Sequence, residues 1–321
     1  MAVVAAVETQ RQPSFAGLFE AICANIGQVV RGKDEVIRLA VCCLVAEGHL
    51  LIEDVPGVGK TSLAKALAAS VGGTFGRVQF TPDLLPSDVV GTSVWNQRTA
   101  TFDYRPGPIF TNILLADEIN RASPKTQSAL LESMAEEQVT ADGVTRELPR
   151  PFMVIATQNP LEHHGTYPLP ESQLDRFLMK LSVGYPDRFS EADLLANDGG
   201  DHALASLVPV TDPDHVIAMS DAATRVHLSE PLTAYLLDLA HATRTHRHLA
   251  LGVSPRALLG LQRAIRVWAA STDRAFATPD DIKVLAQPTL AHRVAVSAEA
   301  SLQGIEATDV IAELIATTPV P

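Results

Sequence analysis

The chain has few of the residue types that mark disulfide-stabilised or zinc-binding proteins. Only three of its 321 residues are cysteine, and no Cys-x-x-C pair occurs. A disulfide framework and a cysteine-rich zinc site are therefore excluded as the basis of the fold. Cys23, Cys42 and Cys43 are expected to be buried thiols, because the adjacent pair lies in an apolar stretch of helical pattern.

Long apolar runs and runs of basic charge are also missing. The longest apolar stretch, from Leu39 to Ala46, is much shorter than a membrane span, and Met1 to Val7 is apolar without a basic leader. The formal net charge is −12, no run of five Lys or Arg occurs, and aromatic content is 5%. A nonspecific hold on nucleic-acid phosphates would oppose this charge. We expect a cytoplasmic protein with no membrane insertion and no nucleic-acid partner.

The sequence does contain the alternating pattern of an α/β protein. Hydrophobic residues make up 46% of the chain, which is enough for a sizeable core. The predicted parallel strands are 49–53, 76–80, 112–117, 152–158 and 177–183. The predicted helices are 15–29, 35–46, 61–70, 84–91, 124–137 and 171–176. This order favours a three-layer α/β/α core around a five-stranded parallel sheet.

A phosphate-binding loop is predicted between the first strand and the helix that follows it. In the segment from Glu53 to Thr61, Gly57 and Gly59 allow backbone N–H groups to turn toward phosphate, and Lys60 adds a cation. The Thr61 hydroxyl is suited to Mg²⁺. Asp54 departs from the G-x-x-x-x-G-K-[ST] pattern, which has glycine there. An ordinary Gly-Pro turn is the alternative interpretation.

Two further strands end in polar residues. Asp117 and Glu118 follow the strand at 112–117, where an aspartate can hold Mg²⁺ and a glutamate can polarise the attacking water. Asn159 follows the next strand, where it could orient that water. Ligands bind at the carboxyl edge of such sheets. The alternatives are a solvated strand end for the two carboxylates and a plain turn for Asn159.

These motifs together resemble the MoxR branch of the AAA+ ATPases, over roughly residues 15 to 295. The segments that carry the resemblance are Glu53 to Thr61, Asp117 to Lys125, Ala156 to Pro160 and Leu174 to Phe177. The resemblance covers the Asp54 variant. It implies a P-loop NTPase fold, ATP and Mg²⁺ as cofactors, and a homo-oligomer that forms a hexameric ring.

The resemblance also implies roles for single residues. Arg176 corresponds to an arginine finger offered to a neighbouring subunit, and Arg256 to a sensor 2 arginine that touches the γ-phosphate from the chain's own lid. Val30 lies in the segment that packs beside adenine. The nucleotide-binding turn comprises Gly57, Val58, Gly59, Lys60, Thr61 and Ser62, with Thr61 and Asp117 toward Mg²⁺ and with Glu118 and Asn159 as catalytic residues. Surface salt bridges are the alternative for both arginines.

We predict an ATPase core at 1–190, a linker at 191–212 and a small all-α lid at 213–321. Two hairpins are expected at 93–105 and 138–148, as client-contacting elements or as plain surface features. In the lid, Ser254-Pro255 and Thr278-Pro279 predict capped helix starts.

The predicted function is ATP hydrolysis that remodels a protein client. The resemblance implies a chaperone-like role with a von Willebrand factor A domain partner, often in metal-centre maturation. A regulatory ATP-binding module with little turnover and a DNA-remodelling motor are the alternatives. The His163-His164 pair and the group His241, His246 and His248 are interpreted as structural or solvated histidines, because neither has the spacing of a metal site.

Overall fold

A five-stranded parallel sheet lies at the centre of the protein, with strand order β2-β5-β8-β1-β9. The structure is a computed structural model that describes residues 14–161, 165–196 and 201–320. The strands are β1 (Leu50–Glu53), β2 (Phe75–Gln79), β5 (Ile113–Asp117), β8 (Met153–Gln158) and β9 (Met179–Leu181). Neighbouring strands pair in parallel, as predicted. Helices cover both faces of the sheet, and this is why β1, β5 and β8 are nearly continuous apolar runs.

Alternate strand residues belong to two separate apolar clusters, and these define the three layers. Leu50 and Ile52 pack with α1 (Phe15–Gly27), α2 (Asp34–Val45) and α3 (Lys60–Ser70). On the opposite face, strand residues such as Leu51 and Leu114 pack with α5 (Pro124–Glu136). Successive side chains of a strand point to opposite faces, so one short strand supports both layers. The cysteines are buried within the first cluster, as expected.

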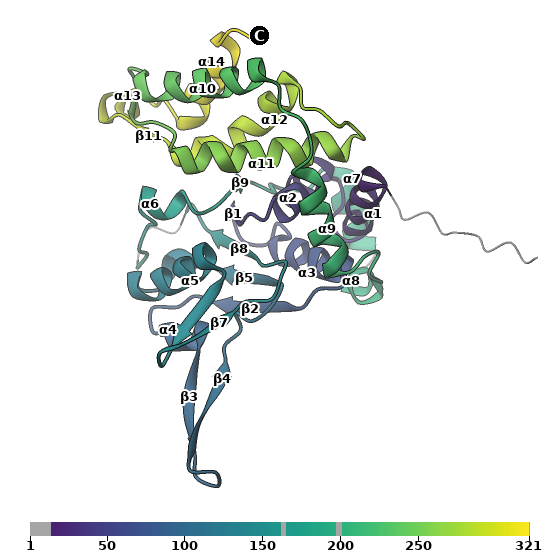
Figure 1. Cartoon of the computed structure of the whole chain (residues 1–321), viewed down its shortest axis with the longest axis vertical. Coiled ribbons are helices and arrows are strands. Elements are labelled where there is room, and N and C mark those ends of the chain that lie inside the picture. Colours follow the sequence, from purple (N-terminus) through teal and green to yellow (C-terminus); the bar gives the residue numbers. More distant parts are fainter. Residues whose placement is uncertain (1–13, 162–164, 197–200, 321) are drawn as a thin grey trace, which may run out of the picture.

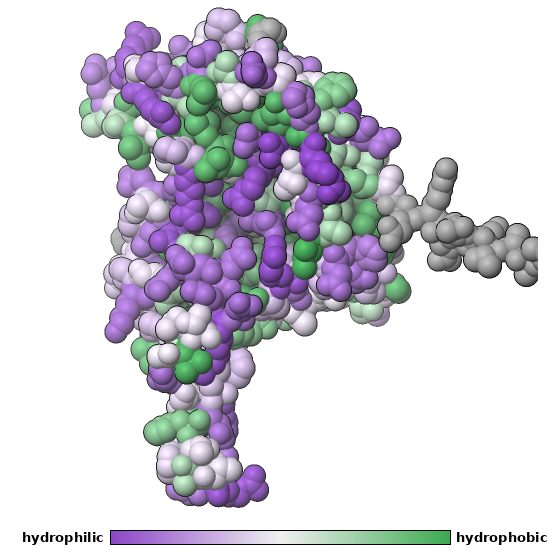
Figure 2. All heavy atoms as spheres, viewed as in Figure 1, coloured by the Kyte–Doolittle hydropathy of each residue, from purple (hydrophilic) through white to green (hydrophobic). Residues whose placement is uncertain are grey.

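Two hairpins extend from the sheet on the α5 side. The first consists of β3 (Gly91–Asn96) and β4 (Thr101–Pro106), which follow α4 (Pro86–Val90) and project away from the body (Figure 1). The second consists of β6 (Gln138–Ala141) and β7 (Val144–Glu147). Both hairpins were predicted. Figure 2 shows apolar surface on the projecting hairpin, where Phe102 is 70% exposed.

The segment between core and lid is more regular than the predicted linker at 191–212. It contains the end of α7 (Arg188–Ala196) and all of α8 (Asp201–Ser206). The predicted linker therefore contains a short helix, α8, that the sequence analysis did not predict. Ala203, Leu204 and Leu207 pack against the main apolar cluster, and this tertiary contact accounts for a helix that is too short to be clear in the sequence. Residues 197–200 of the predicted linker lie outside the described residues.

The lid is built from helices joined by short capped connections. They are α9 (Pro213–Ala223), α10 (Glu230–Thr245), α11 (Pro255–Ser271), α12 (Pro279–Leu290), η3 (Ala291–Arg293), α13 (Ala298–Leu302) and α14 (Ala307–Thr317). Ser254 caps α11 as predicted, since its hydroxyl accepts a hydrogen bond from the Ala257 N–H group. The predicted all-α lid needs one correction. β10 (Leu249–Leu251) and β11 (Ala295–Val296) form a two-stranded antiparallel ladder, too short for a period-2 signal.

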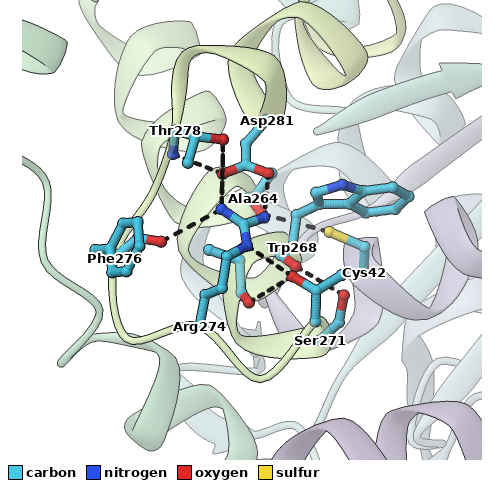
Figure 3. Close-up of polar contacts among 10 residues, drawn as sticks. Cys42, Ala264, Trp268, Ser271, Arg274, Phe276, Thr278 and Asp281 are labelled. Carbon is cyan, nitrogen blue, oxygen red and sulfur yellow. Dashed lines mark hydrogen bonds and ion pairs between the residues drawn. The ribbon is translucent and has the colours of Figure 1, made fainter.

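A buried ion pair fixes the connection between α11 and α12. The Arg274 guanidinium donates to both carboxylate oxygens of Asp281, over 2.8 and 2.5 Å, and Asp281 also accepts from the N–H group of Thr278, the N-cap of α12 (Figure 3). The predicted capping box at Thr278 is thus confirmed. Asp281 is only 3% exposed, so this bidentate pair holds the end of one lid helix to the start of the next.

The lid lies along the β9 edge of the sheet, at the end of the molecule opposite the projecting hairpin (Figure 1). Helix α12 and the short helix η3 contact β9 directly. Helix α11 packs on α1, α2 and α9, so the lid also rests on the helices of one face of the core.

Candidate functional site

The three predicted polar motifs meet in one cavity at the carboxyl edge of the sheet. The cavity is about 320 Å³ in volume. It is lined by Pro56, Gly57, Gly59, Lys60, Thr61, Ser62, Asp117, Glu118 and Asn159. Gly57 and Gly59 have φ angles of 87° and 93°, values that side-chain-bearing residues rarely adopt. The loop can therefore turn its backbone toward the cavity, and α3 begins directly after it.

Asp54, where the phosphate-loop pattern has glycine, anchors this loop to the chain that leaves β9. Its carboxylate accepts hydrogen bonds from the N–H groups of Val183, at 2.5 Å, and Gly184, at 3.1 Å, and from the Ser182 hydroxyl at 3.1 Å. The Lys60 ammonium group donates to the Asp54 carbonyl at 2.7 Å. No local sequence pattern indicates this partner segment, which lies about 130 residues further along the chain.

Residues of the two strands beside β5, which no local sequence pattern indicated, hold both carboxylates of the cavity. The buried Thr157 hydroxyl donates to Asp117 at 2.6 Å and accepts from the Glu118 N–H group at 2.9 Å. Arg77 pairs with the second Asp117 oxygen at 2.7 Å. Gln79 donates to Glu118 at 2.8 Å. Each partner lies on β2 or β8, the two strands that flank β5, so strand order determines the contacts and local sequence does not.

The remaining predicted residues of this site lie in or beside the cavity wall. Asn159 is 7% exposed, and its side-chain oxygen accepts from the Leu161 N–H group at 3.1 Å. Val30 and Val58 are buried within the apolar cluster on the α1–α3 face and do not line the cavity. Their side chains support the loop and the segment after α1.

Thr61 and Asp117 offer a hydroxyl and a carboxylate to the same cavity. Oxygen ligands of this kind suit Mg²⁺, which retains several waters and binds few protein groups. Among the residues that the structure describes, no group of three or more His, Cys, Asp or Glu side chains has the arrangement of a metal-binding cluster. The site therefore fits a metal that binds together with a phosphate ligand better than a metal caged by protein side chains.

The two predicted arginines line a different cavity, of about 120 Å³. Arg176 and Arg256 lie there with Arg263, Arg293 and the segment 47–49. Because 47–49 precedes β1 and Arg176 precedes β9, this cavity is at the amino edge of the sheet, away from Lys60. Arg256 therefore lies beside Arg176 and away from Lys60, although we predicted that it touches the nucleotide of its own chain. The cause is the position of the lid, whose helix α11 begins beside Asp175.

Buried basic groups surround this arginine cavity. Arg176 donates to the Leu131 carbonyl, and the side chain of Arg293 is 4% exposed with Asp175 at 3.6 Å. Burial lowers the pKa of Arg293 to about 10, and the Asp175 carboxylate opposes this shift. Burial also lowers the pKa of His49 to about 4 and of His292 to about 3. The lining of the cavity thus combines the exposed Arg256 and Arg263 with the buried His49 and Arg293.

Comparisons with known proteins agree with this geometry. The family described as "ATPase family associated with various cellular activities (AAA)" matches residues 49–179, and the AAA lid domain matches residues 241–314. The chain is 48% identical to the uncharacterized protein YeaC of Bacillus subtilis, over 92% of this chain and 93% of that protein. It is 39% identical to the chaperone MoxR1 of Mycobacterium tuberculosis, over 92% of this chain and 81% of that protein.

A solved structure supports the same assignment. A crystal structure described as that of a candidate ATPase from Cytophaga hutchinsonii matches with a TM-score of 0.89 and 36% identity, over 96% of each chain. The fold and the site define an AAA+ ATPase with a phosphate-binding loop and a helical lid. Within that class, the chain belongs to the MoxR family. In the described part of the chain, no helix is both long and apolar enough to cross a membrane.

Proposed function

We propose that the protein hydrolyses ATP in the cavity at the carboxyl edge and uses the reaction to remodel a protein client. The observation that supports this most is the meeting of Lys60, Asp117, Glu118 and Asn159 around one space of about 320 Å³. The loop N–H groups and Lys60 bind the phosphates. Glu118 accepts a proton from the attacking water, and Asn159 orients that water. When bound, Mg²⁺ neutralises developing phosphate charge, held through Thr61 and Asp117.

The lysine must exchange partners when nucleotide binds. Lys60 now donates to the Asp54 carbonyl, and a phosphate oxygen replaces this acceptor in our proposal. Glu118 is held by Gln79 and Arg121, at 2.8 and 3.1 Å, in a conformation with a φ angle of 55°. These contacts fix the carboxylate at the cavity wall, which suits a general base that must act in one geometry.

We propose further that Arg176 and Arg256 both serve the nucleotide of a neighbouring subunit. Both lie at the amino edge, and Arg256 is exposed. A homo-oligomeric ring, hexameric in our proposal, would bring this edge of one subunit to the Lys60 cavity of the next. The name of the relative MoxR1, a chaperone, supports the protein client, and the resemblance to the MoxR branch supports a von Willebrand factor A domain partner.

Glu118→Gln tests the hydrolysis. The variant should bind ATP as the wild type does while phosphate release falls by at least about 100-fold, because loss of a general base typically removes 10²–10⁴-fold in rate. Lys60→Ala should instead weaken binding of a fluorescent ATP analogue. The matched control is Glu132→Gln, the same chemical change on the exposed surface of α5, which should leave both quantities unchanged.

Two results would contradict the proposal. Unchanged phosphate release in Glu118→Gln would remove the general base, and normal affinity in Lys60→Ala would remove the phosphate loop. If the wild type releases phosphate slowly and no added protein accelerates this release, a regulatory ATP-binding module would be favoured. Affinity capture on the ATP-bound Glu118→Gln ring, with the Lys60→Ala protein as the negative control, then identifies proteins held only in the ATP state.

A further inference from the structure

The segment that carries Arg176 is held from the lid on both sides of that arginine. On one side, the Ser254 hydroxyl lies 3.1 Å from both carboxylate oxygens of Asp175. On the other side, the Phe177 carbonyl accepts from Arg293 Nε and Nη2, at 3.1 and 2.6 Å, and lies 2.9 Å from His292 Nε2. Arg176 thus lies between two chain neighbours that are bound to the lid.

Burial makes these contacts stronger than surface hydrogen bonds. Phe177 is fully buried, and the side chains of Arg293 and Asp175 are 4% and 21% exposed. A buried guanidinium is costly without a partner, and the ion pair with Asp175 offsets part of this penalty. The contacts between Arg293, Asp175 and the Phe177 carbonyl therefore favour one position of the lid relative to this segment.

Close packing reinforces the same junction. A Cβ atom placed on Gly260 of α11 would lie 2.9 Å from Leu178 Cδ1, so the helix approaches the start of β9 as closely as glycine allows. Within the core, the side chain of Arg176 has a hydrogen bond to the Leu131 carbonyl. The core also holds this segment, through the Arg176 N–H bond to the Gln173 carbonyl and the Leu178 N–H bond to the His49 carbonyl, so lid and core together determine where the Arg176 backbone lies.

We propose that Ser254, His292 and Arg293 form a latch by which the lid positions Arg176 toward the nucleotide of the neighbouring subunit. This inference rests on the proposed function of Arg176. Ser254 caps α11, and His292 and Arg293 belong to η3 after α12, so the latch residues come from two separate elements of the lid. The latch residues are positioning residues, because they act through Arg176 and do not touch ATP.

Ser254→Asp tests the latch without removing the helix cap. Aspartate is as good an N-cap as serine, so α11 keeps its start, but its carboxylate would face the carboxylate of Asp175 where a donor is needed. We expect kcat for ATP hydrolysis to fall about 100-fold, the effect of a displacement of roughly 1 Å in a catalytic group. Affinity of the chain's own site for an ATP analogue should stay unchanged. Ser254→Thr retains the hydroxyl and should match the wild type.

A double-mutant cycle separates the latch from a general loosening of the lid. If Ser254→Asp acts through Arg176, it should add no further loss to Arg176→Ala, measured by single-turnover phosphate release. It should still lower the rate in an Arg256→Ala background. Ser254→Gly provides a gentler second variant, since glycine is a well-tolerated N-cap residue. Its kcat should fall while nucleotide affinity is retained.

The possible failures are distinguishable. If Arg176→Ala hydrolyses ATP normally, the proposed role of Arg176 and the latch both fail. If Arg176→Ala is inactive while Ser254→Asp and Ser254→Gly match the wild type, the latch alone is wrong. An additional loss when Ser254→Asp is combined with Arg176→Ala would also overturn it, since the lesion would then act elsewhere.

Discussion

The two edges of the central sheet carry different polar side chains, with carboxylates and a phosphate-binding loop at one edge and arginines at the other. At the carboxyl edge, Asp117 and Glu118 are held by side chains of the same chain that come from the strands beside β5, among them Thr157 and Gln79. At the amino edge, the polar groups are long arginines that come from the α6–β9 connection and from the lid, where α6 is Glu171–Leu174. Among the residues that the structure describes, the cavity at the first edge is lined by Lys60 and no arginine, whereas the cavity at the second edge is lined by four arginines. This division suggests that one catalytic event requires two subunits.

The largest expected effect comes from the amino-edge arginines. Arg176→Ala and Arg256→Ala should each be nearly inactive, because an arginine that stabilises the transferring phosphoryl group contributes roughly 10³–10⁵ in rate. Mixtures with Lys60→Ala subunits locate the lesion. Because both arginines lie away from the Lys60 cavity, each mixture should recover part of the steady-state phosphate release.

Mixing Lys60→Ala with Glu118→Gln subunits is the matched control for these experiments. Both lesions then lie at the carboxyl edge, so no site regains a full set of groups and activity should stay low. If the Arg256→Ala mixture stays inactive despite proven co-assembly while the Arg176→Ala mixture recovers, Arg256 acts within its own chain. The comparison of the two edges would then hold for Arg176 alone.

The sequence predicted the carboxyl edge better than the amino edge, for a physical reason. Glycines, Lys60 and strand-end carboxylates are local signals, because each follows a short apolar run whose end determines its place. The position of Arg256 depends on how the lid packs against β9 and α2, and no local pattern records that packing. The hydrogen bonds of Thr157 and Asp54 were not predicted for the same reason, since their partners are distant in the sequence.

A smaller effect is expected from Asp54→Ala, which tests whether the carboxyl edge depends on its anchor. Two backbone N–H groups would lose a carboxylate acceptor. Hydrogen bonds to charged groups contribute about 1.5–3 kcal/mol each, so we expect the free energy of unfolding to fall by roughly 3–6 kcal/mol. Nucleotide affinity should fall too, because the loop loses its hydrogen bonds to the segment that follows β9. Asp83→Ala, on an exposed loop, is the control.

Denaturant unfolding with and without an ATP analogue measures both quantities for Asp54→Ala. Because Asp54 and Lys60 belong to the same loop of one chain, a mixture of Asp54→Ala and Lys60→Ala subunits should not recover phosphate release. Recovery in that mixture would contradict the assignment of Asp54 to the carboxyl edge. Wild-type stability together with wild-type affinity would show that the three hydrogen bonds of Asp54 do not hold the loop.

The smallest effect concerns acid, which should weaken the amino edge first. His49 accepts from the Val154 N–H group at Nδ1, so its Nε2–H donates to the Met134 carbonyl, and a second proton has no acceptor. Burial lowers the pKa of His49 from 6.5 to about 4. Between these values the unfolded chain binds more protons, so stability is full above pH 6.5 and falls as pH decreases toward 4. At pH 5 the loss of stability from this histidine is about 2 kcal/mol relative to pH 7.

His49→Gln should therefore lose less stability than the wild type between pH 7 and 5 in urea unfolding, whereas the exposed His241→Gln should follow the wild-type slope. Equal slopes in all three proteins would mean that the ring of His49 is not held neutral at this edge.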